Sequence, residues 1–294
     1  ADLSLDAKAT FNANTGHIKD VHINKLLIAG SEIKGSVYLG ENGKYYADLH
    51  GPRLNINQLI LDNPSQSNDK TEEFFVNANF DEVYVWDLPP ITNVKVKLQN
   101  NTITLPKIEM SGLVYDQPVY ITSWAKNGVR NFRFSSSDAG RVLKKLEIID
   151  SLIAGEIVIK GKIINNNKNE KTSANISIQN FGVKDAPLFT QVLNSASLIG
   201  LVDTLQGKGI QFQHLNAEAI FTKDRIQILD SFAYGASLGV SATGTIIRSN
   251  KVASIKGMIV PAYGLNRLID KIPILGRILT GGEKEGLLAA EYFT

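Results

Sequence analysis

The pentapeptide Gly235-Ala236-Ser237-Leu238-Gly239 has the glycine and serine spacing of a nucleophile elbow, the turn that carries the catalytic serine of many hydrolases. Such a serine needs a sharp strand-to-helix turn and a histidine later in the chain. The last histidine is His214, and the pattern over 233–247 predicts a continuous strand. We therefore interpret the pentapeptide as small residues in a curved strand.

Other residues that could do chemistry are scattered. The four histidines, His17, His22, His50 and His214, lack the paired spacing of a metal site, and the chain has no cysteine. The glycine-rich run 281–286 lacks the Gly-Lys-Ser/Thr ending of a phosphate-binding loop. We expect neither an enzyme nor a resident cofactor or metal.

Nucleic-acid binding is also disfavoured. The net charge is only +2 at pH 7, with 31 basic and 29 acidic side chains. Arg130-Asn131-Phe132-Arg133-Phe134 is the only run that interleaves aromatic and basic residues as a single-stranded nucleic acid would require. We expect no nucleic-acid partner.

The elements that must position any site are mainly strands. Apolar and polar residues alternate over 3–11, 74–80 and 94–98, which is typical of strands with one buried and one solvated face. Roughly sixteen such segments can be distinguished. Asn42-Gly43, Asn127-Gly128 and the asparagine-rich turn 165–169 separate neighbouring strands, so the sequence predicts a mainly antiparallel sheet built from hairpins.

Helical periodicity is confined to three segments. Asp138 is a candidate N-cap for a helix that carries Val142, Leu143, Leu146, Ile149 and Ile153 on one face. A second helix is expected over 187–205. The third is expected over 264–279, with an interruption at Pro273. Its basic amphipathic part, 265–277, fits a helix that lies on a membrane or blocks the mouth of an apolar groove, or else a helix that caps the sheet edge. A weak internal repeat is visible over 45–61, 131–152, 173–205 and 252–279, where a strand leads through a loop that contains glycine or proline into a helical segment. In the first of these the strand is expected to break at Gly51-Pro52.

These few helices are too short to cover a long sheet, so part of the apolar face should line a trough. The predicted fold is an elongated, twisted antiparallel β-sheet that forms an open apolar groove, with a few short amphipathic helices. The sequence contains no window of 18 apolar residues, so we expect no segment that spans a bilayer. The chain opens Ala1-Asp2-Leu3 without a secretory signal, and we expect a mature or excised segment of a longer protein.

The second half of the chain resembles the AsmA-like C-terminal region family of Gram-negative envelope proteins, the group that includes AsmA, TamB and YhdP. The segments that carry the resemblance are Ser137–Leu146, Gly155–Ile157, Phe181–Leu193 around Asp185-Ala186-Pro187, Gly209–Phe212, Gly235–Gly239 and Gly257–Gly282. The last of these is the most specific, because it contains Val260-Pro261-Ala262-Tyr263, Ile272-Pro273-Ile274-Leu275-Gly276 and Leu279-Thr280-Gly281-Gly282 in order. Residues 1–125 match only as a strand array, so we place the division at 125/126 and expect 126–294 to continue the first part as one elongated groove.

The resemblance implies an elongated β-groove with an apolar interior, held at the inner membrane and acting in phospholipid transport to the outer membrane or in outer-membrane biogenesis. We therefore expect a periplasmic, cell-envelope protein whose partners are phospholipid acyl chains, the inner or outer membrane, and an envelope protein. The groove candidates are Phe132, Phe134, Leu193, Leu198, Leu268, Ile272 and Leu275. The alternative is a structural scaffold that binds an outer-membrane assembly partner by β-strand addition.

Overall fold

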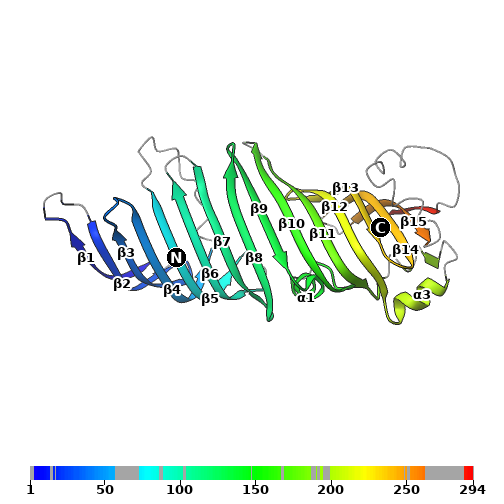
Figure 1. Cartoon of the computed structure of the whole chain (residues 1–294), viewed down its shortest axis with the longest axis horizontal. Helices are drawn as coiled ribbons and strands as arrows, with labels where there is room; N and C mark the ends of the chain where they lie inside the picture. Colours follow the sequence, from blue (N-terminus) through cyan, green and yellow to red (C-terminus); the bar gives the residue numbers. More distant parts are fainter. Residues whose placement is uncertain are drawn as a thin grey trace. The chain divides into compact units, whose positions relative to one another are not determined.

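The chain is mainly β, and its strands follow one another in an open sheet in the order of the sequence, from β1 to β16 (Figure 1). The computed structural model describes residues 3–13, 16, 18–56, 73–85, 89–101, 104–146, 148–166, 169–186, 190, 193–194, 199–247, 249, 252–261 and 288–293. The chain divides into two compact units, unit 1 (Ala1–Phe134) and unit 2 (Ser135–Thr294). The predicted mainly antiparallel, open sheet with few short helices is confirmed.

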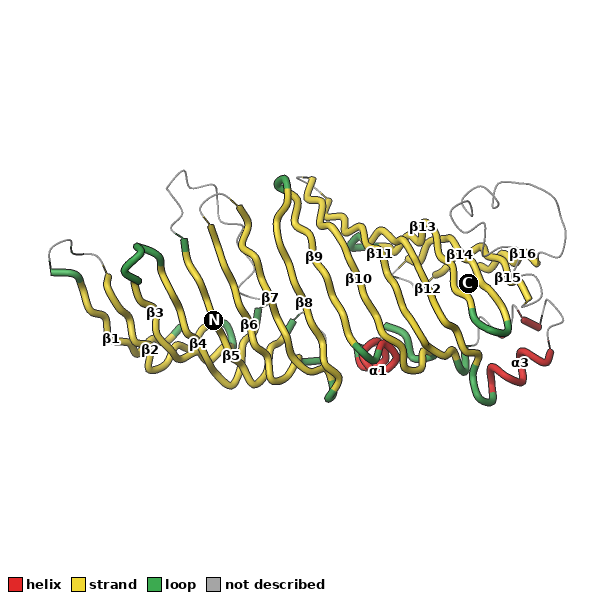
Figure 2. The backbone as a smooth tube through the Cα atoms, in the orientation of Figure 1, coloured by secondary structure: helices red, strands yellow, loops and turns green. Residues whose placement is uncertain are grey.

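The elements that the structure delimits in unit 1 are all strands (Figure 2). The strands are β1 (Ser4–Phe11), β2 (Ile18–Ile28), β3 (Ser31–Leu39), β4 (Tyr45–Asn55), β5 (Phe74–Tyr84), β6 (Ile91–Asn101), β7 (Thr104–Val114), β8 (Gln117–Lys126) and β9 (Val129–Ser136), of which the last runs across the division. From β1 to β8 the neighbours pair antiparallel, except that β4 and β5 run parallel over the register from Tyr45↔Phe74 to Asn55↔Tyr84. The hairpin pattern did not predict this parallel pair.

The expected break at Gly51-Pro52 does not occur, because β4 continues through both residues to Asn55. The β3–β4 register shifts between Glu32 and Lys34, so Pro52 lies opposite an irregularity rather than in a regular ladder. Proline is tolerated at such a bulge because no ladder hydrogen bond needs the backbone N–H that proline lacks. The helix expected to follow in 45–61 lies largely outside the described residues.

Unit 2 combines strands with short helices, two of which can be delimited within the described residues. Its elements are α1 (Ala139–Lys145), β10 (Leu152–Asn166), β11 (Asn169–Val183), α3 (Ile199–Gln206), β12 (Ile210–Phe221), β13 (Arg225–Tyr234), β14 (Leu238–Ile247), β15 (Val252–Pro261) and β16 (Leu288–Phe293). Every neighbouring pair from β10 to β16 is antiparallel. Both helices lie in connections at the sheet end where β10 and β12 begin.

The predicted helices are only partly confirmed. The Asp138 carboxylate accepts a hydrogen bond from the Arg141 amide at 2.9 Å, which is the expected N-cap. However, α1 ends at Lys145, and Ile149 and Ile153 are 41% exposed, so the amphipathic spacing overestimated the helix. In the second segment the described part ends with α3, and the third, 264–279, lies outside the described residues.

Both Asn-Gly sites join neighbouring strands, as predicted, but the two turns differ in geometry. Asn127 and Gly128 both have positive φ, 53° and 73°, as a two-residue hairpin turn of this type requires. In the β3–β4 hairpin only Gly43 of the Asn-Gly pair has positive φ, so this turn is of another type.

The strand predicted through 233–247 is wrong. Strand β13 ends at Tyr234, and the Gly235 amide donates to the Leu238 carbonyl in a turn before β14 begins.

Candidate functional site

One face of the unit 1 sheet is apolar over many strands. Residues opposite each other in adjacent strands share a face. One such row is Leu49, Ala78, Val96, Met110 and Ile121, and the next is Val37, Ala47, Val76, Leu98 and Ile108. Ala78 is buried, and the other members of both rows are half-buried. We call this surface the apolar face of unit 1.

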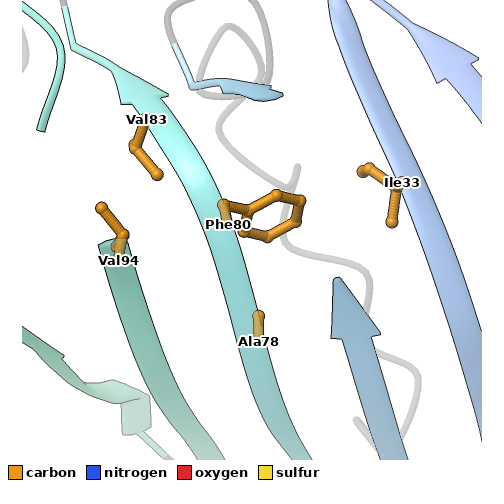
Figure 3. Close-up of a cluster of buried hydrophobic side chains, with 5 residues drawn as sticks. All are labelled: Ile33, Ala78, Phe80, Val83 and Val94. Carbon is orange, nitrogen blue, oxygen red and sulfur yellow. The ribbon is translucent and has the colours of Figure 1, made fainter. Parts of the chain in front are cut away.

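A buried cluster lies on the same face toward the far end of β5. It consists of Ile33, Ala78, Phe80, Val83 and Val94, from strands β3, β5 and β6 (Figure 3). The Phe80 side chain extends toward Ile33 on β3, although β4 lies between the two strands. This is possible because Gly51 faces Phe80 on β4, and a Cβ there would lie 2.0 Å from the Glu32 carbonyl oxygen and 3.3 Å from the Phe80 ring. This cluster is the part of the apolar face that is buried from solvent.

The opposite face of unit 1 is polar. The row Ser36, Asp48, Asn77, Lys97 and Glu109 crosses the same strands. The Asn77 amide donates to the Asp48 carboxylate at 3.2 Å, and Tyr38, Tyr46 and Phe75 stack with centroids 5.5 and 5.2 Å apart. The alternation read from the sequence therefore gives one solvated and one apolar face in this unit.

Unit 2 has a corresponding apolar face. Its central row is Ile157, Ile178, Leu215, Ala233, Val240 and Ile259. A second row lies nearer the hairpin turns and consists of Ile163, Thr172, Phe221, Ile226 and Ile246. Most of the central row is buried, whereas all members of the second row are half-buried. The face thus becomes more accessible toward the hairpin turns.

The helical segments of unit 2 close the other end of its sheet. Val142 of α1, Leu205 of α3 and Leu193 in the connection before it are completely buried. Phe181 and Phe212 stack near this end, with centroids 5.2 Å apart, and are 2% and 5% exposed. The helices therefore complete a core instead of leaving an open surface here.

The predicted groove residues have different positions. Phe132 and Phe134 lie on β9 and are half-buried, whereas Leu193 is completely buried and offers no surface to a ligand. Leu198, Leu268, Ile272 and Leu275 lie outside the described residues. The sequence reasoning did not name the half-buried rows of both apolar faces, although their period-two alternation could have identified them.

Arg130 shares the face of Phe132 and Phe134, because alternate residues of a strand point the same way. Its Nη1 donates to Ser123 Oγ at 3.0 Å and to the Pro106 carbonyl at 3.3 Å. Ser123 stands opposite Ile108 and therefore on the apolar face. Burial lowers the pKa of the Arg130 guanidinium. An arginine thus lies at the apolar face of unit 1.

The described residues contain no group of three His, Asp or Glu side chains that could hold a metal ion. Ser237 of the elbow-like pentapeptide is exposed in the β13–β14 turn and precedes strand β14, not a helix. No helix among the described residues is long and apolar enough to cross a membrane. The apolar face of each unit, with its half-buried rows, is the surface considered as a ligand site.

Comparison with known proteins gives no identification. No family model, no curated protein and no solved structure matches this chain. The resemblance to the AsmA-like family remains a prediction, and the two apolar faces are the basis for a functional hypothesis.

Proposed function

We propose that this chain is a lipid-binding and lipid-conducting segment of a periplasmic AsmA-like protein. In this proposal it acts in phospholipid transport between the inner and outer membranes and has no enzymatic activity. The observation that carries the proposal is the run of half-buried apolar residues in register across strands β3 to β8. No second layer covers this face among the described residues of unit 1.

Acyl chains have the chemistry that such a face accommodates. Each methylene removed from water contributes roughly 0.8 kcal/mol, and the interaction is non-directional. The acyl chain of a lipid can therefore lie anywhere along a continuous apolar row while the polar head of the lipid stays in solvent. The opposite face, with Asp48, Lys97 and Glu109, keeps the loaded protein soluble in this scheme.

The first test is organic-solvent extraction of the purified chain, followed by quantitative lipid mass spectrometry. We expect phospholipid in a stoichiometric amount. A protein that carries no lipid, and acquires none from vesicles that contain a labelled phospholipid, would contradict the proposal.

A pair of variants locates the bound chains. Val96 is half-buried on the apolar face, and its neighbour Lys97 is exposed on the polar face. Val96→Asp should lower bound lipid several-fold because it places a charge among the acyl chains, whereas Lys97→Asp should leave it unchanged. Circular dichroism checks folding, and Ala47→Trp fills the face without adding a charge if Val96→Asp does not fold. Equal lipid content in all variants would place the lipid elsewhere.

A structural scaffold remains the second candidate, and strand β1 favours it. In the sheet order β1 has β2 on one side, and no described residue pairs with its other edge. Leu3, Leu5 and Phe11 at this edge are 70%, 62% and 62% exposed, which suits β-strand addition by an envelope protein. Replacement of Leu5 by proline should abolish binding of such a partner and leave bound lipid unchanged. Loss of lipid in this variant would argue against the scaffold.

A further inference from the structure

The guanidinium of Arg130 occupies an unusual position for a charged group. It reaches the side chain of Ser123 on the apolar face of unit 1, next to the row that contains Ile108. Phe132 and Phe134 follow on the same side of β9. The nearby Ser123 hydroxyl donates to the Asn131 carbonyl at 3.1 Å, which holds its oxygen in place as an acceptor for Arg130.

Among the described residues, Arg130 has two hydrogen-bond partners, and both are neutral. They are Ser123 Oγ and the Pro106 carbonyl, and Arg130 forms no ion pair with any described residue. A partly buried cation is costly unless it is paired, and a guanidinium has five N–H donors in a planar fork. Within the part of unit 1 that the structure describes, this arrangement leaves a positive charge without a negative partner beside an apolar surface.

We propose that Arg130 binds the phosphate group of an amphiphilic ligand whose apolar tail lies along the apolar face of unit 1. This inference rests on the proposed function and adds the position and charge of the headgroup. Arginine suits phosphate because its fork makes two parallel, charge-assisted hydrogen bonds to the phosphate oxygens. Ser123 and Pro106 act as positioning groups that fix the guanidinium plane.

Arg133 provides a matched control. It lies three residues further along the same strand, is exposed, and belongs to the opposite face because it is an odd number of positions from Arg130. A methionine at either position keeps an unbranched side chain and removes the charge. The two variants therefore change net charge equally and differ in the face from which the charge is removed.

Isothermal titration calorimetry with the full chain tests the inference. The probes are decyl phosphate, uncharged decanol and inorganic phosphate alone, each below its aggregation limit. For the wild-type chain we expect decyl phosphate to bind more tightly than either other probe. Arg130→Met should weaken decyl phosphate binding by roughly 10- to 100-fold and leave decanol unchanged. Arg133→Met should change neither, and Arg130→Lys should retain part of the preference.

The possible outcomes separate the two proposals. If decyl phosphate and decanol bind the wild-type chain equally well, or if Arg130→Met weakens both alike, the headgroup inference is wrong while lipid binding stands. If no probe with a decyl chain binds, the proposed function fails. If inorganic phosphate binds as tightly as decyl phosphate and is lost in Arg130→Met, Arg130 is a phosphate site, and the amphiphile part of the inference is overturned.

Discussion

Unit 1 and unit 2 form their cores differently from the same kind of strand. In unit 1 the buried cluster consists of strand residues, with Phe80 placed over Gly51. In unit 2 the most deeply buried side chains include Val142 from α1 and Leu205 from α3. The comparison shows that strands with alternating apolar and polar residues, without helices, produce a face that is only partly buried. Helical connections close one end of that face where they are present.

The largest expected effect concerns the strand-built core of unit 1. Phe80→Ala should lower the free energy of unfolding by about 3 to 5 kcal/mol, because it removes a large side chain that is 4% exposed. Urea denaturation followed by hydrogen exchange would measure the loss and assign it to unit 1. Phe132→Ala, at a half-buried position of the same face, should cost clearly less. Equal losses would mean that the cluster is not the core of this unit.

The next effect concerns the helix-sealed end of unit 2. A Cβ on Gly140 would lie 2.6 Å from the Ala154 amide nitrogen and 2.7 Å from the Leu152 carbonyl oxygen. Gly140→Ala should therefore push α1 away from β10 and cost about 1 to 3 kcal/mol. The measurement is hydrogen exchange at the β10 amides, with unit 1 unaffected.

Gly200→Ala is the control for this substitution, because a Cβ there meets no heavy atom of the described residues within 4 Å outside the local helix backbone. It should stabilise α3 by up to about 1 kcal/mol through helix propensity. If both glycine variants behave alike, close packing of α1 on β10 does not hold this end of the sheet.

The smallest expected effect concerns the polar face of unit 1, which has an aromatic stack. Tyr46 lies between Tyr38 and Phe75, with interplanar angles of 17° and 13°. A double-mutant cycle of Tyr46→Leu and Phe75→Leu should give a coupling of about 0.5 to 1.5 kcal/mol. The cycle is measured by thermal and urea unfolding. A coupling near zero would mean that the rings lie together without contributing to the sheet.

Much of this fold could be predicted, because alternation and turn residues are local signals. The strands, the order of the hairpins and the Asp138 cap follow from residues close together in sequence. The parallel β4–β5 pair could not be predicted, since nothing within Tyr45–Asn55 specifies which later strand it joins. Gly51-Pro52 resembled a strand end because the bulge that admits the proline depends on β3.

The candidate site was predictable in its chemistry but less so in its residues. Leu193 has an apolar side chain in an amphipathic segment, yet the fold buries it completely. Exposure depends on the packing of distant elements, which the spacing of residues does not reveal. Arg130 was visible only as part of an aromatic and basic run. The even spacing from Arg130 to Phe132 and Phe134 was the signal that could have placed it on the apolar face.

The parallel alignment of β4 and β5 has a consequence for how the chain reaches its native state. Two antiparallel strands joined by a tight turn can pair residue by residue, starting at the turn. The parallel strands β4 and β5 cannot, because β5 begins at Phe74, well after β4 ends at Asn55. Joining them requires residues as far apart in the sequence as Tyr45 and Phe74 to meet before further contacts between the two strands can form. We expect the hairpins on either side to assemble early and this junction to be the slow step in completing the first unit.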